Sequence, residues 1–494
     1  MRAFLLHSGE ERLRPLLERL TIPHGTALEP EEAGRHFVIH WGSYHPDRGG
    51  ADVLQPVRAV VLAASPQRAG ETLKLHGLDS ALGENGAEKA DRRGGKGRER
   101  DEGGDRQAWI HDFLVPVFHL EALTLFHRAP GVFYGGRAPA GVRLPEGAEV
   151  RGYEEVGLDL PTYYGSKALR EAVKAVYALG LDYGVVRIGV RTGGTLAVRR
   201  VEAVPGLTPR LAELFAGAMN RYGTRLEERS AAARLEVMLG ADPEFLLLNE
   251  RGKVRFASAF MEKDGPVGCD AIVLPSRRKV YPLAELRPRP STEVRELIVQ
   301  LHRTLQLAAR IITEEELVWV AGGMPVRGFP LGGHIHFSRV ELESRLLRVL
   351  DNYLALPLTL IEDDTTGGRK PQYGFLGDFR RQRHGGFEYR VLPSWMVSPA
   401  VAKGVLALAK LAAEHYAQLR QRPLSDPEVA RAYYRGDKAR IRPLLPALWR
   451  DLERLPGYAK LESYLLPLRR MMVQMRPWNE REDIRTKWKI RPYS

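Results

Sequence analysis

Cysteine is nearly absent from this sequence, because Cys269 is the single cysteine among 494 residues. One thiol cannot form an intramolecular disulfide, and it cannot build a zinc finger that needs several cysteine ligands. Long apolar runs are also missing, since no stretch reaches the ~18 residues that a membrane-spanning helix requires. The first residues, MRAFLLHSGEERLRP, lack the apolar core and cleavage site of a signal peptide. We therefore expect a soluble, cytoplasmic protein from a reducing compartment, with no membrane partner.

Acidic residues are outnumbered, because 61 Asp and Glu stand against 74 Lys and Arg and leave a net charge of +13. Such a balance is typical of proteins that bind nucleic acid or another polyanion, or that use anionic substrates such as ATP. The basic residues are spread along the chain, without the interleaved aromatic residues that stacking on single-stranded nucleic acid requires. A solvated basic surface explains the charge equally well. A nucleic-acid partner is therefore not favoured.

The length suggests two or more domains, at ~100–200 residues per domain. Residues 1–80 read as strands that alternate with helices, which is typical of an α/β lobe. The expected strands span 2–7, 36–42 and 57–64, and the expected helices span 10–20 and 66–76. Residues 80–107 are rich in glycine and charge and poor in large apolar residues. Such a segment buries too little surface to offset its ordering entropy, so it is predicted to be a disordered loop.

A helix is predicted over 166–179, followed by strands over 181–190 and 195–201 and a helix from 209 to 222. The stretch LGLDYGVVRIGV followed by VRRVEAVPGLTP resembles the C-terminal lobe of an ATP-grasp domain, and this resemblance covers roughly residues 1–225. Where that family places metal-binding acids and an amide, the aligned residues are Arg187, Arg200 and Glu202. Arginine cannot ligate magnesium. The resemblance therefore implies an ATP-grasp frame in a degenerate copy that binds an anion or the other domain instead.

Four short runs in the second half of the chain share one layout. In Gly332-Gly333-His334-Ile335-His336-Phe337 the two histidines are two residues apart, so in a strand both imidazoles point to the same face. Three further runs place two ionisable groups at the same spacing: Asp242 and Glu244, Glu285 and Arg287, and Glu388 and Arg390. We expect the four faces to meet in one site.

The loop that follows residue 361 combines glycines with positive charge. Arg369, Lys370 and Arg381 are candidates for binding the phosphates or carboxylate of a nucleotide cofactor or substrate. An ordinary solvated loop is an equally good explanation. The remaining part, 421–494, reads as a helical, basic extension that packs on the preceding domain or binds a partner.

The chemistry of the four runs favours phosphoryl transfer. The carboxylates of Asp242, Glu244, Glu285 and Glu388 suit Mg²⁺, with one or both histidines as further ligands. Arg287, Arg380 and Arg390 are the candidate catalytic residues, because they can balance charge on a moving phosphate. Two alternatives remain. One is a zinc metalloenzyme built on His334 and His336, and the other is a non-catalytic basic binding protein.

The motifs GADPEFLL, ELRPRP, GGHIHF, YGFLGDFR and FEYRVLPS occur in this order between about residues 237 and 420. In that order they resemble the phage-type COOH–NH2 ligases, or amidoligases, of the glutamine synthetase and γ-glutamylcysteine ligase fold. The resemblance implies a curved antiparallel sheet with helices, and ATP with Mg²⁺ (Mn²⁺ as an alternative) as cofactors. It also implies a carboxylate that is activated as an acyl phosphate and then attacked by the amine of an amino acid, a peptide or a polyamine-like molecule.

The resemblance also implies roles for single residues. Glu244, Glu285, Glu388 and one of the two histidines would hold metal, and Arg390 would contact phosphate. Asp242 departs from the Glu of the family motif and has a shorter reach. The whole chain is then of the α+β class: an ATP-grasp-like domain over 1–225, an amidoligase domain over 235–420 and the helical extension over 421–494.

Overall fold

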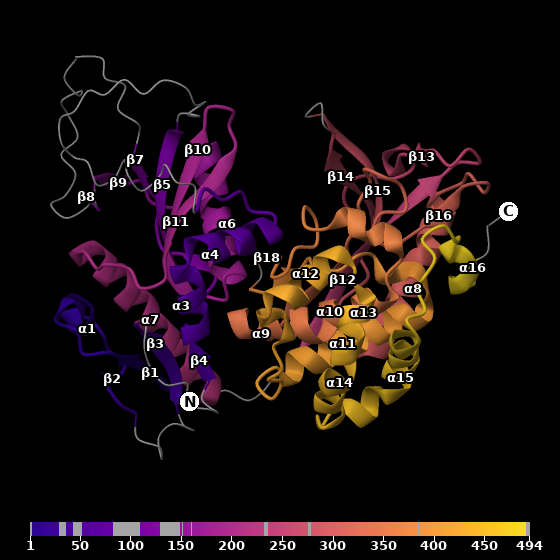
Figure 1. Cartoon of the computed structure of the whole chain (residues 1–494). Coiled ribbons are helices and arrows are strands. Elements are labelled where there is room, and N and C mark those ends of the chain that lie inside the picture. Colours follow the sequence, from indigo (N-terminus) through magenta and orange to yellow (C-terminus); the bar gives the residue numbers. More distant parts are fainter. Residues whose placement is uncertain are drawn as a thin grey trace. The chain divides into compact units, whose positions relative to one another are not determined.

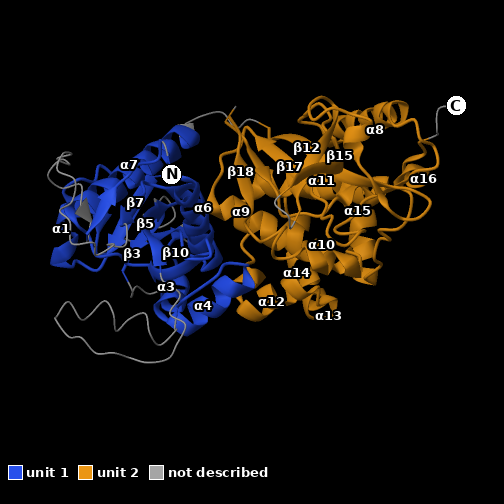
Figure 2. Cartoon of the chain, turned by 90° about the horizontal axis from the view of Figure 1, so that it is seen from above, with its two compact units in different colours: residues 1–233 blue, residues 234–494 orange. Residues whose placement is uncertain are grey.

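The computed structural model describes residues 2–28, 36–42, 52–82, 109–128, 149–150, 152–159, 161–231, 236–274, 278–383 and 385–490. The chain divides into two compact units, Met1–Ala233 and Arg234–Ser494 (Figures 1 and 2). Both combine helices with antiparallel sheets, so the predicted mixed α+β class is confirmed. Most of the loop predicted at 80–107 lies outside the described residues. Within the described ranges, no helix is long and apolar enough to cross a bilayer.

Unit 1 begins with a small parallel sheet. Its strand order is β2-β1-β3-β4, formed by β2 (His24–Gly25), β1 (Arg2–His7), β3 (His36–Trp41) and β4 (Asp52–Leu54). β1 and β3 are short apolar runs that pair in parallel along their whole length. Leu5 and Ile39 at their centre are completely buried. Burial of this kind is expected for parallel strands that are covered on both faces.

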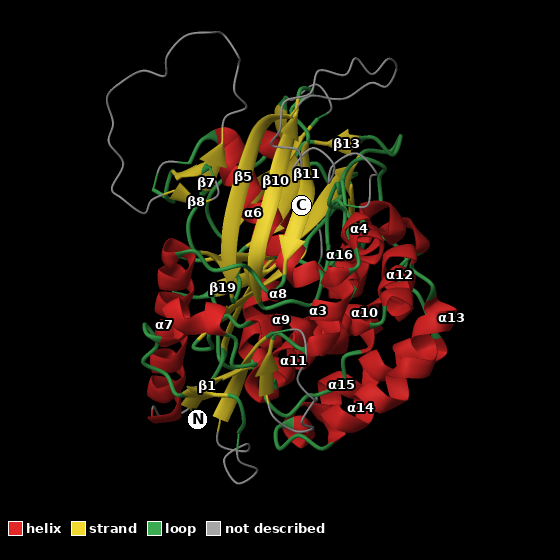
Figure 3. Ribbon diagram, turned by 60° about the vertical axis from the view of Figure 1, so that its left-hand side comes forward, coloured by secondary structure: helices red, strands yellow, loops and turns green. Residues whose placement is uncertain are grey.

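The second sheet of unit 1 has the order β11-β10-β5-β7-β9-β8, with β6 paired to β5. Its strands are β5 (Trp109–Phe118), β6 (Glu121–Ala122), β7 (Phe126–Arg128), β8 (Glu149–Val150), β9 (Tyr153–Glu155), β10 (Tyr183–Arg191) and β11 (Leu196–Glu202). One face packs on α6 (Tyr163–Ala178), which Figure 3 shows behind β5 and β10. Leu114 and Tyr183, on the other face, share a core with Phe215 of α7 (Pro209–Ala231). Because strand side chains alternate between faces, β5 and β10 contribute to both cores.

The strand predicted over 57–64 is wrong, because these residues form α3 (Val57–Ala64). The run VRAVVLAA is rich in β-branched residues, yet short apolar runs do not distinguish a buried strand from a helix. Ala59 and Val60 are buried while Val61 is 54% exposed, which is the pattern of a helix with one covered side. The predicted helix over 66–76 is confirmed as α4 (Pro66–Leu75). The one predicted over 10–20 is shorter, with a 3₁₀ turn (Glu11–Leu13) followed by α1 (Arg14–Leu17).

His76 at the end of α4 makes the stability of unit 1 depend on pH. Burial and the charge of Lys174 lower the pKa of its imidazole to about 3. An unfolded histidine titrates near ~6.5, so the unfolded state takes up the proton first. Stability should fall as the pH decreases from about 6.5 towards 3, by roughly 1.4 kcal/mol per pH unit. We expect the Tm of the wild type to drop more between pH 7.5 and 5 than that of His76→Gln, and equal drops would contradict this.

Unit 2 is built on an antiparallel sheet with the order β14-β15-β12-β17-β19-β18, while β13 and β16 also pair with β12. Its strands are β12 (Met238–Leu248), β13 (Val254–Arg255), β14 (Val267–Val273), β15 (Lys279–Leu286), β16 (Val318–Val320), β17 (Gly333–Ser338), β18 (Phe379–Arg381) and β19 (Phe387–Tyr389). β12 pairs with β17 from Met238 to Pro243, and with β15 at Glu244 and Phe245. Proline cannot donate to a ladder, and here it stands where the ladder to β17 ends.

Helices complete unit 2. α8 (Val294–Ile311) follows β15, and α11 (Pro399–His415) packs against α8, α9 (Ser344–Leu350) and α15 (Tyr458–Gln474). The helical stretch that contains Pro357 continues from α9 as a π turn (Asp351–Ala355), then α10 (Leu356–Leu358) and a 3₁₀ turn (Thr359–Ile361). Proline removes one helical hydrogen bond, and the wider π turn before it accommodates that loss.

The residues after 420 belong to the same unit. They form α12 (Pro427–Arg435), α13 (Lys438–Ile441), α14 (Leu445–Glu453), α15 and α16 (Ile484–Trp488). The Trp478 backbone N–H donates to the carbonyl of Ile361 at 2.9 Å, and the Trp488 indole donates to the carbonyl of Met396 at 2.7 Å. The two tryptophans therefore anchor the C-terminal residues to the 3₁₀ turns Thr359–Ile361 and Trp395–Val397.

Candidate active site

The register of four strands brings the six predicted metal-binding side chains onto one face of the sheet. Residues paired across antiparallel strands point to the same face, as do alternate residues along a strand. Three cross-strand pairs carry the six side chains: Asp242 with His334, Glu244 with Glu285, and His336 with Glu388. The four runs therefore lie side by side on β12, β15, β17 and β19, as expected.

Glycines on the same face make room for the charged groups. Gly268 on β14 pairs with Glu285, and a Cβ there would lie 2.2 Å from Arg287 Nη1. Gly332 precedes β17, and a Cβ there would lie 2.2 Å from Nε2 of His334. At Gly268 such a Cβ would also lie 2.5 Å from the backbone oxygen of Lys263, which cannot swing away as the end of an arginine can. At Gly332 it would displace the imidazole of His334.

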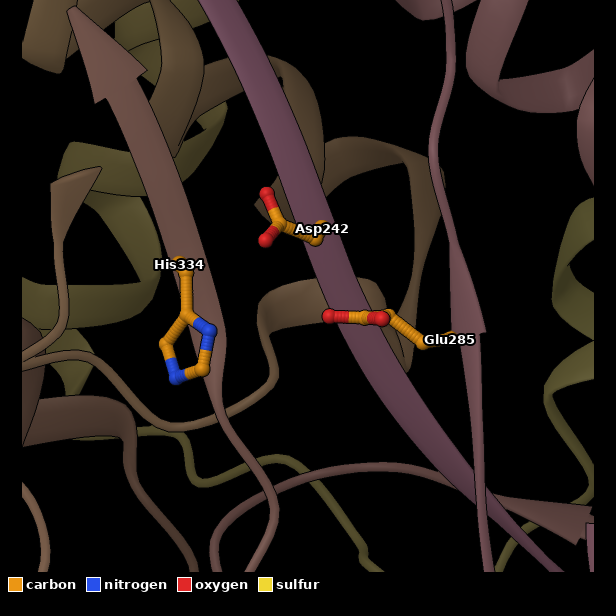
Figure 4. A group of neighbouring side chains, drawn as sticks. All are labelled: Asp242, Glu285 and His334. Atoms are coloured by element: carbon orange, nitrogen blue, oxygen red, sulfur yellow. The ribbon is translucent and has the colours of Figure 1, made fainter. Parts of the chain in front are cut away.

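Asp242, Glu285 and His334 form one compact group (Figure 4). Each offers one ligand atom, and these atoms all lie within 4.8 Å of one another. Figure 4 shows Glu285 extending from β15 across the front of β12 towards His334, with Asp242 between them. Two further triads satisfy the same distance: Asp242 with His336 and Glu388, and Glu244 with Asp270 and Glu285.

Asp270 on β14 was not predicted from the sequence as a site residue. It stands in GCDAIV, between apolar residues and without an ionisable partner two positions away. Only the register of β14 against β15 places it near Glu285 and Glu244. The one available signal was a lone acid in a strand interior, where acids are uncommon.

Crowded carboxylates resist ionisation on this face. Burial and the charge of Asp242 raise the pKa of Glu285 to about 8, although Arg287 opposes the shift. Burial, Glu285 and Asp270 raise the pKa of Glu244 well above its usual range, although its Oε2 accepts a 2.6 Å hydrogen bond from the Gly332 N–H. Burial and the neighbouring acids thus disfavour the ionised forms of both carboxylates, and a bound cation would relieve this cost.

The two histidines differ in charge. Burial and the charges of Arg390 and Arg369 lower the pKa of His334 well below its usual range, so its imidazole is neutral. Its Nδ1 lies 3.1 Å from Glu388 Oε1. A neutral imidazole keeps one nitrogen lone pair that can serve a ligand. Burial opposes protonation of His336, but its hydrogen bond to Asp242 and the charge of Glu388 outweigh burial and raise its pKa.

Each of the three predicted catalytic arginines lies beside a carboxylate of the face. Arg390 pairs with Glu388, and Arg380 Nη1 lies 3.3 Å from Glu388 Oε2. Burial opposes ionisation of Arg390, but the charge of Glu388 raises its pKa. Arg287 pairs with Glu285 and also donates to the carbonyls of Lys263 and Gly265 at 3.1 and 3.2 Å.

The three predicted cofactor-binding residues lie in different surroundings. Arg369 is buried at the end of the 3₁₀ helix Asp364–Arg369, and its Nη1 donates to the Val391 carbonyl at 2.8 Å. Lys370 Nζ lies 2.9 Å from Glu362 Oε2 and 3.9 Å from the Tyr433 ring centroid. Arg381 is exposed on β18. Arg369 is therefore buried and close enough to His334 and Glu244 to lower their pKa values. Lys370 is held in a buried ion pair, and Arg381 lies on the edge strand of the sheet.

A buried acid of the C-terminal segment, Glu480, holds the loop that carries Arg369. Its carboxylate accepts hydrogen bonds from Thr365 Oγ1 at 2.8 Å, Thr366 Oγ1 at 2.8 Å and the Met324 N–H at 2.9 Å. The Gly323 N–H and the Trp478 indole donate to the same group. Sequence reasoning missed Glu480 because it stands in the charged run NERED, which resembles a solvated surface.

Several solved structures are similar to part of the chain. The ATP-grasp ligase PsnB complexed with minimal precursor is 13% identical over 44% of this chain and 98% of its own, with a TM-score of 0.29. D-alanine–D-alanine ligase from Bacillus anthracis is 13% identical over 47% of this chain and 100% of its own, with a TM-score of 0.28. A bifunctional glutathione synthetase from Pasteurella multocida is 12% identical over 49% and 48%, with a TM-score of 0.30. No curated protein sequence matches the chain.

A family comparison matches more than half of the 494 residues, from 239 to 490. The matched range contains the three cross-strand pairs of acids and histidines, the arginines beside them and the C-terminal segment with Glu480. The matching family is described as phage phiEco32-like COOH·NH2 ligase, type 2. This chain belongs to that family of carboxylate–amine ligases.

Proposed function

We propose that Arg234–Ser494 catalyses the ATP- and Mg²⁺-dependent ligation of a carboxylate to an amine through an acyl phosphate. The observation that carries the proposal is the convergence of five carboxylates and two histidines, with arginines beside them, on one face of the sheet. Membership of the carboxylate–amine ligase family supports it. We also propose that the curled antiparallel sheet is a version of the glutamine synthetase and γ-glutamylcysteine ligase fold.

The donor set fits a hard divalent cation. Oxygen ligands with a single neutral imidazole are suited to Mg²⁺ or Mn²⁺. Burial first and neighbouring acids second raise the pKa values of Glu244 and Glu285, and a bound cation would favour their ionised forms. Asp242, Glu285 and His334 would hold one ion. The remaining acids, Glu244, Asp270 and Glu388, would complete further positions. Of the two histidines, His334 is the better ligand because it is neutral. Bound Mg²⁺ would neutralise the charge of the ATP phosphates.

The arginines would position the phosphate that is transferred. Arg390 and Arg380 would hold the γ-phosphoryl oxygens while a substrate carboxylate oxygen attacks phosphorus and ADP leaves. The amine nitrogen then attacks the acyl carbon, the bond from carbon to the phosphate oxygen breaks, and the amine proton passes to solvent. Arg287 would steady Glu285 and the phosphate chain. The enzyme contributes alignment and charge neutralisation, which are the main needs of phosphoryl transfer.

The predicted cofactor-binding residues would contribute in different ways. Arg369 would add positive charge beneath the phosphates, since its charge already acts on His334 and Glu244. Arg381 would meet the nucleotide from the sheet edge. Lys370 would fix the loop through Glu362. We propose that the chain consists of an ATP-grasp-like part, 1–225, an amidoligase core, 235–420, and a helical extension, 421–494.

The proposal is tested by ADP release from the full chain. Pooled amino acids and amines are supplied with ATP and Mg²⁺, and products are identified by mass spectrometry. We expect ADP formation that requires an added carboxylate, and a product equal in mass to both substrates less water. EDTA should abolish turnover and added Mg²⁺ or Mn²⁺ should restore it. Tightly retained zinc without ATP turnover would instead indicate the zinc metalloenzyme. Absence of both metal binding and turnover would indicate a non-catalytic protein.

A further inference from the structure

Two histidines lie side by side in the second sheet of unit 1. His111 belongs to β5 and His127 to β7, and Nδ1 of His111 lies 3.1 Å from Nε2 of His127. Their ring centroids are 5.2 Å apart. The two residues are 16 positions apart in the chain and meet through strand pairing. The ligase reaction proposed for unit 2 does not use them.

The strand register accounts for this contact and adds a third group. His127 pairs with Phe113 of β5, so His111, two residues before Phe113, is its diagonal neighbour on the same face. On its other side, His127 pairs with Glu154 of β9. Two imidazoles and one carboxylate from three neighbouring strands therefore belong to one face of the sheet.

The distance between the two nitrogens fits a bound transition metal. Zinc binds imidazole nitrogens at about 2.0–2.1 Å with tetrahedral geometry, so two such nitrogens lie about 3.3 Å apart. The observed distance of 3.1 Å is close to that value. A hydrogen bond between the rings has the same length and places a proton on one of the two nitrogens. If that ring carries its proton on its other nitrogen, both facing nitrogens offer lone pairs without any net loss of protons.

The surroundings keep His127 in the form that binds metal. Burial and the charge of His111 lower the pKa of His127, although the charges of Asp112 and Glu154 oppose the shift. A neutral imidazole is the form that coordinates metal ions. Because the charge of Glu154 acts on this ring, it would also favour a divalent cation that the ring holds.

Neighbouring rings hold the pair in place, and solvent reaches it. The His111 ring lies against the rings of Phe113 and Tyr164, with centroids 5.9 and 5.5 Å away. The His127 ring stacks on Phe113 at 4.8 Å. Both histidines are half-buried, and Glu154 is exposed. Packing therefore fixes the orientation of the imidazoles, while rotation of its side chain can bring the carboxylate towards them.

The strands that carry these residues pair over short stretches. β7 and β9 have three residues each, and they pair with each other at two positions, while β5 and β7 pair at three. Strands this short contribute little stability by themselves. A metal ion that joins β5, β7 and β9 would stabilise this part of the sheet, because the unfolded chain does not present its ligands together.

We propose that His111 and His127, with Glu154 as the third ligand, form a binding site for zinc or a similar transition-metal ion. Imidazole nitrogen suits such ions, whereas Mg²⁺ prefers oxygen ligands. The site therefore differs in chemistry from the proposed metal site of unit 2. Its role is to hold three strands together, and it does not depend on the ligase function.

The first experiment is calorimetric titration of the full chain with Zn²⁺, in excess Mg²⁺ that competes for the proposed metal site of unit 2. We expect the wild type to bind one more equivalent of zinc than His111→Gln or His127→Gln. Glu154→Gln should bind that equivalent about tenfold more weakly. His24→Gln, which removes an exposed histidine of the same unit, should keep the stoichiometry of the wild type. Equal stoichiometry in the wild type and both variants of the pair would overturn the proposal.

The second experiment compares the Tm with and without zinc, since a ligand that binds only the folded chain raises the Tm. We expect zinc to raise the Tm of the wild type and of His24→Gln more than that of His111→Gln. If the pair is only a hydrogen-bonded contact, His111→Gln has a lower Tm but an unchanged response to zinc. That result would also overturn the proposal, even if zinc binds elsewhere on the chain. Neither measurement uses ATP turnover, so failure of the ligase proposal would not affect this test.

Discussion

Glu285→Gln is expected to lower the rate of ADP formation by about 10²–10³-fold, the loss typical when a charge-stabilising group leaves an active site. Glu285 belongs to two of the three ligand triads, so no other single change removes more of the proposed metal site. Glutamine keeps the shape of the side chain but removes its charge. Because the pKa of Glu285 is raised to about 8, its ionised form is already unfavourable in the fold. Folding should therefore survive the change.

The matched control for this change is Glu314→Gln. Glu314 pairs with Arg255 at 2.8 Å on the surface of the same unit. Exposed pairs contribute little to stability, so this variant should keep both its Tm and its turnover. The two variants are compared by steady-state ADP release and by thermal melting. Undiminished turnover in folded Glu285→Gln would show that the carboxylate face is not the active site.

Glu480→Gln is expected to lower the Tm of the chain by several degrees and to reduce turnover. An amide supplies one acceptor oxygen, and its NH2 group would face the N–H groups of Gly323 or Met324. Leaving buried donors without an acceptor costs about 1–3 kcal/mol each. Thr365 donates to one carboxylate oxygen and Thr366 to the other, so the loop that carries Arg369 would lose one of these two acceptors. We therefore expect a fall in kcat in addition to the loss of stability.

The neighbouring Glu482→Gln serves as the control for that variant. Glu482 is two residues further along and pairs with Lys487 at 3.1 Å, with about half of each side chain exposed. The same loss of charge at this position should change neither melting nor turnover. If Glu480→Gln has the same Tm and the same turnover as Glu482→Gln, the C-terminal segment has no role in positioning the loop.

Spacing along the chain was sufficient to predict which side chains share a face. Side chains in a strand alternate, so His334 and His336, and likewise Asp242 and Glu244, had to point the same way once their runs were recognised as strands. The same reasoning failed for Val57–Ala64, because a short, mostly apolar run fits a buried strand and a covered helix equally well. Local pattern therefore predicts the direction of side chains only where the type of element is already clear.

The sequence by itself determined the two ionisable groups on each run, the single thiol, the basic balance and the order of motifs typical of carboxylate–amine ligases. Only the tertiary structure decided which runs are neighbours. Cross-strand register brought Asp270 to Glu285 and His111 to His127, and the return of the C-terminal segment placed Glu480 beneath the loop with Arg369. These contacts join residues that are far apart in the chain. Their geometry depends on the pairing of whole strands and the packing of whole segments, which no local pattern of residues encodes.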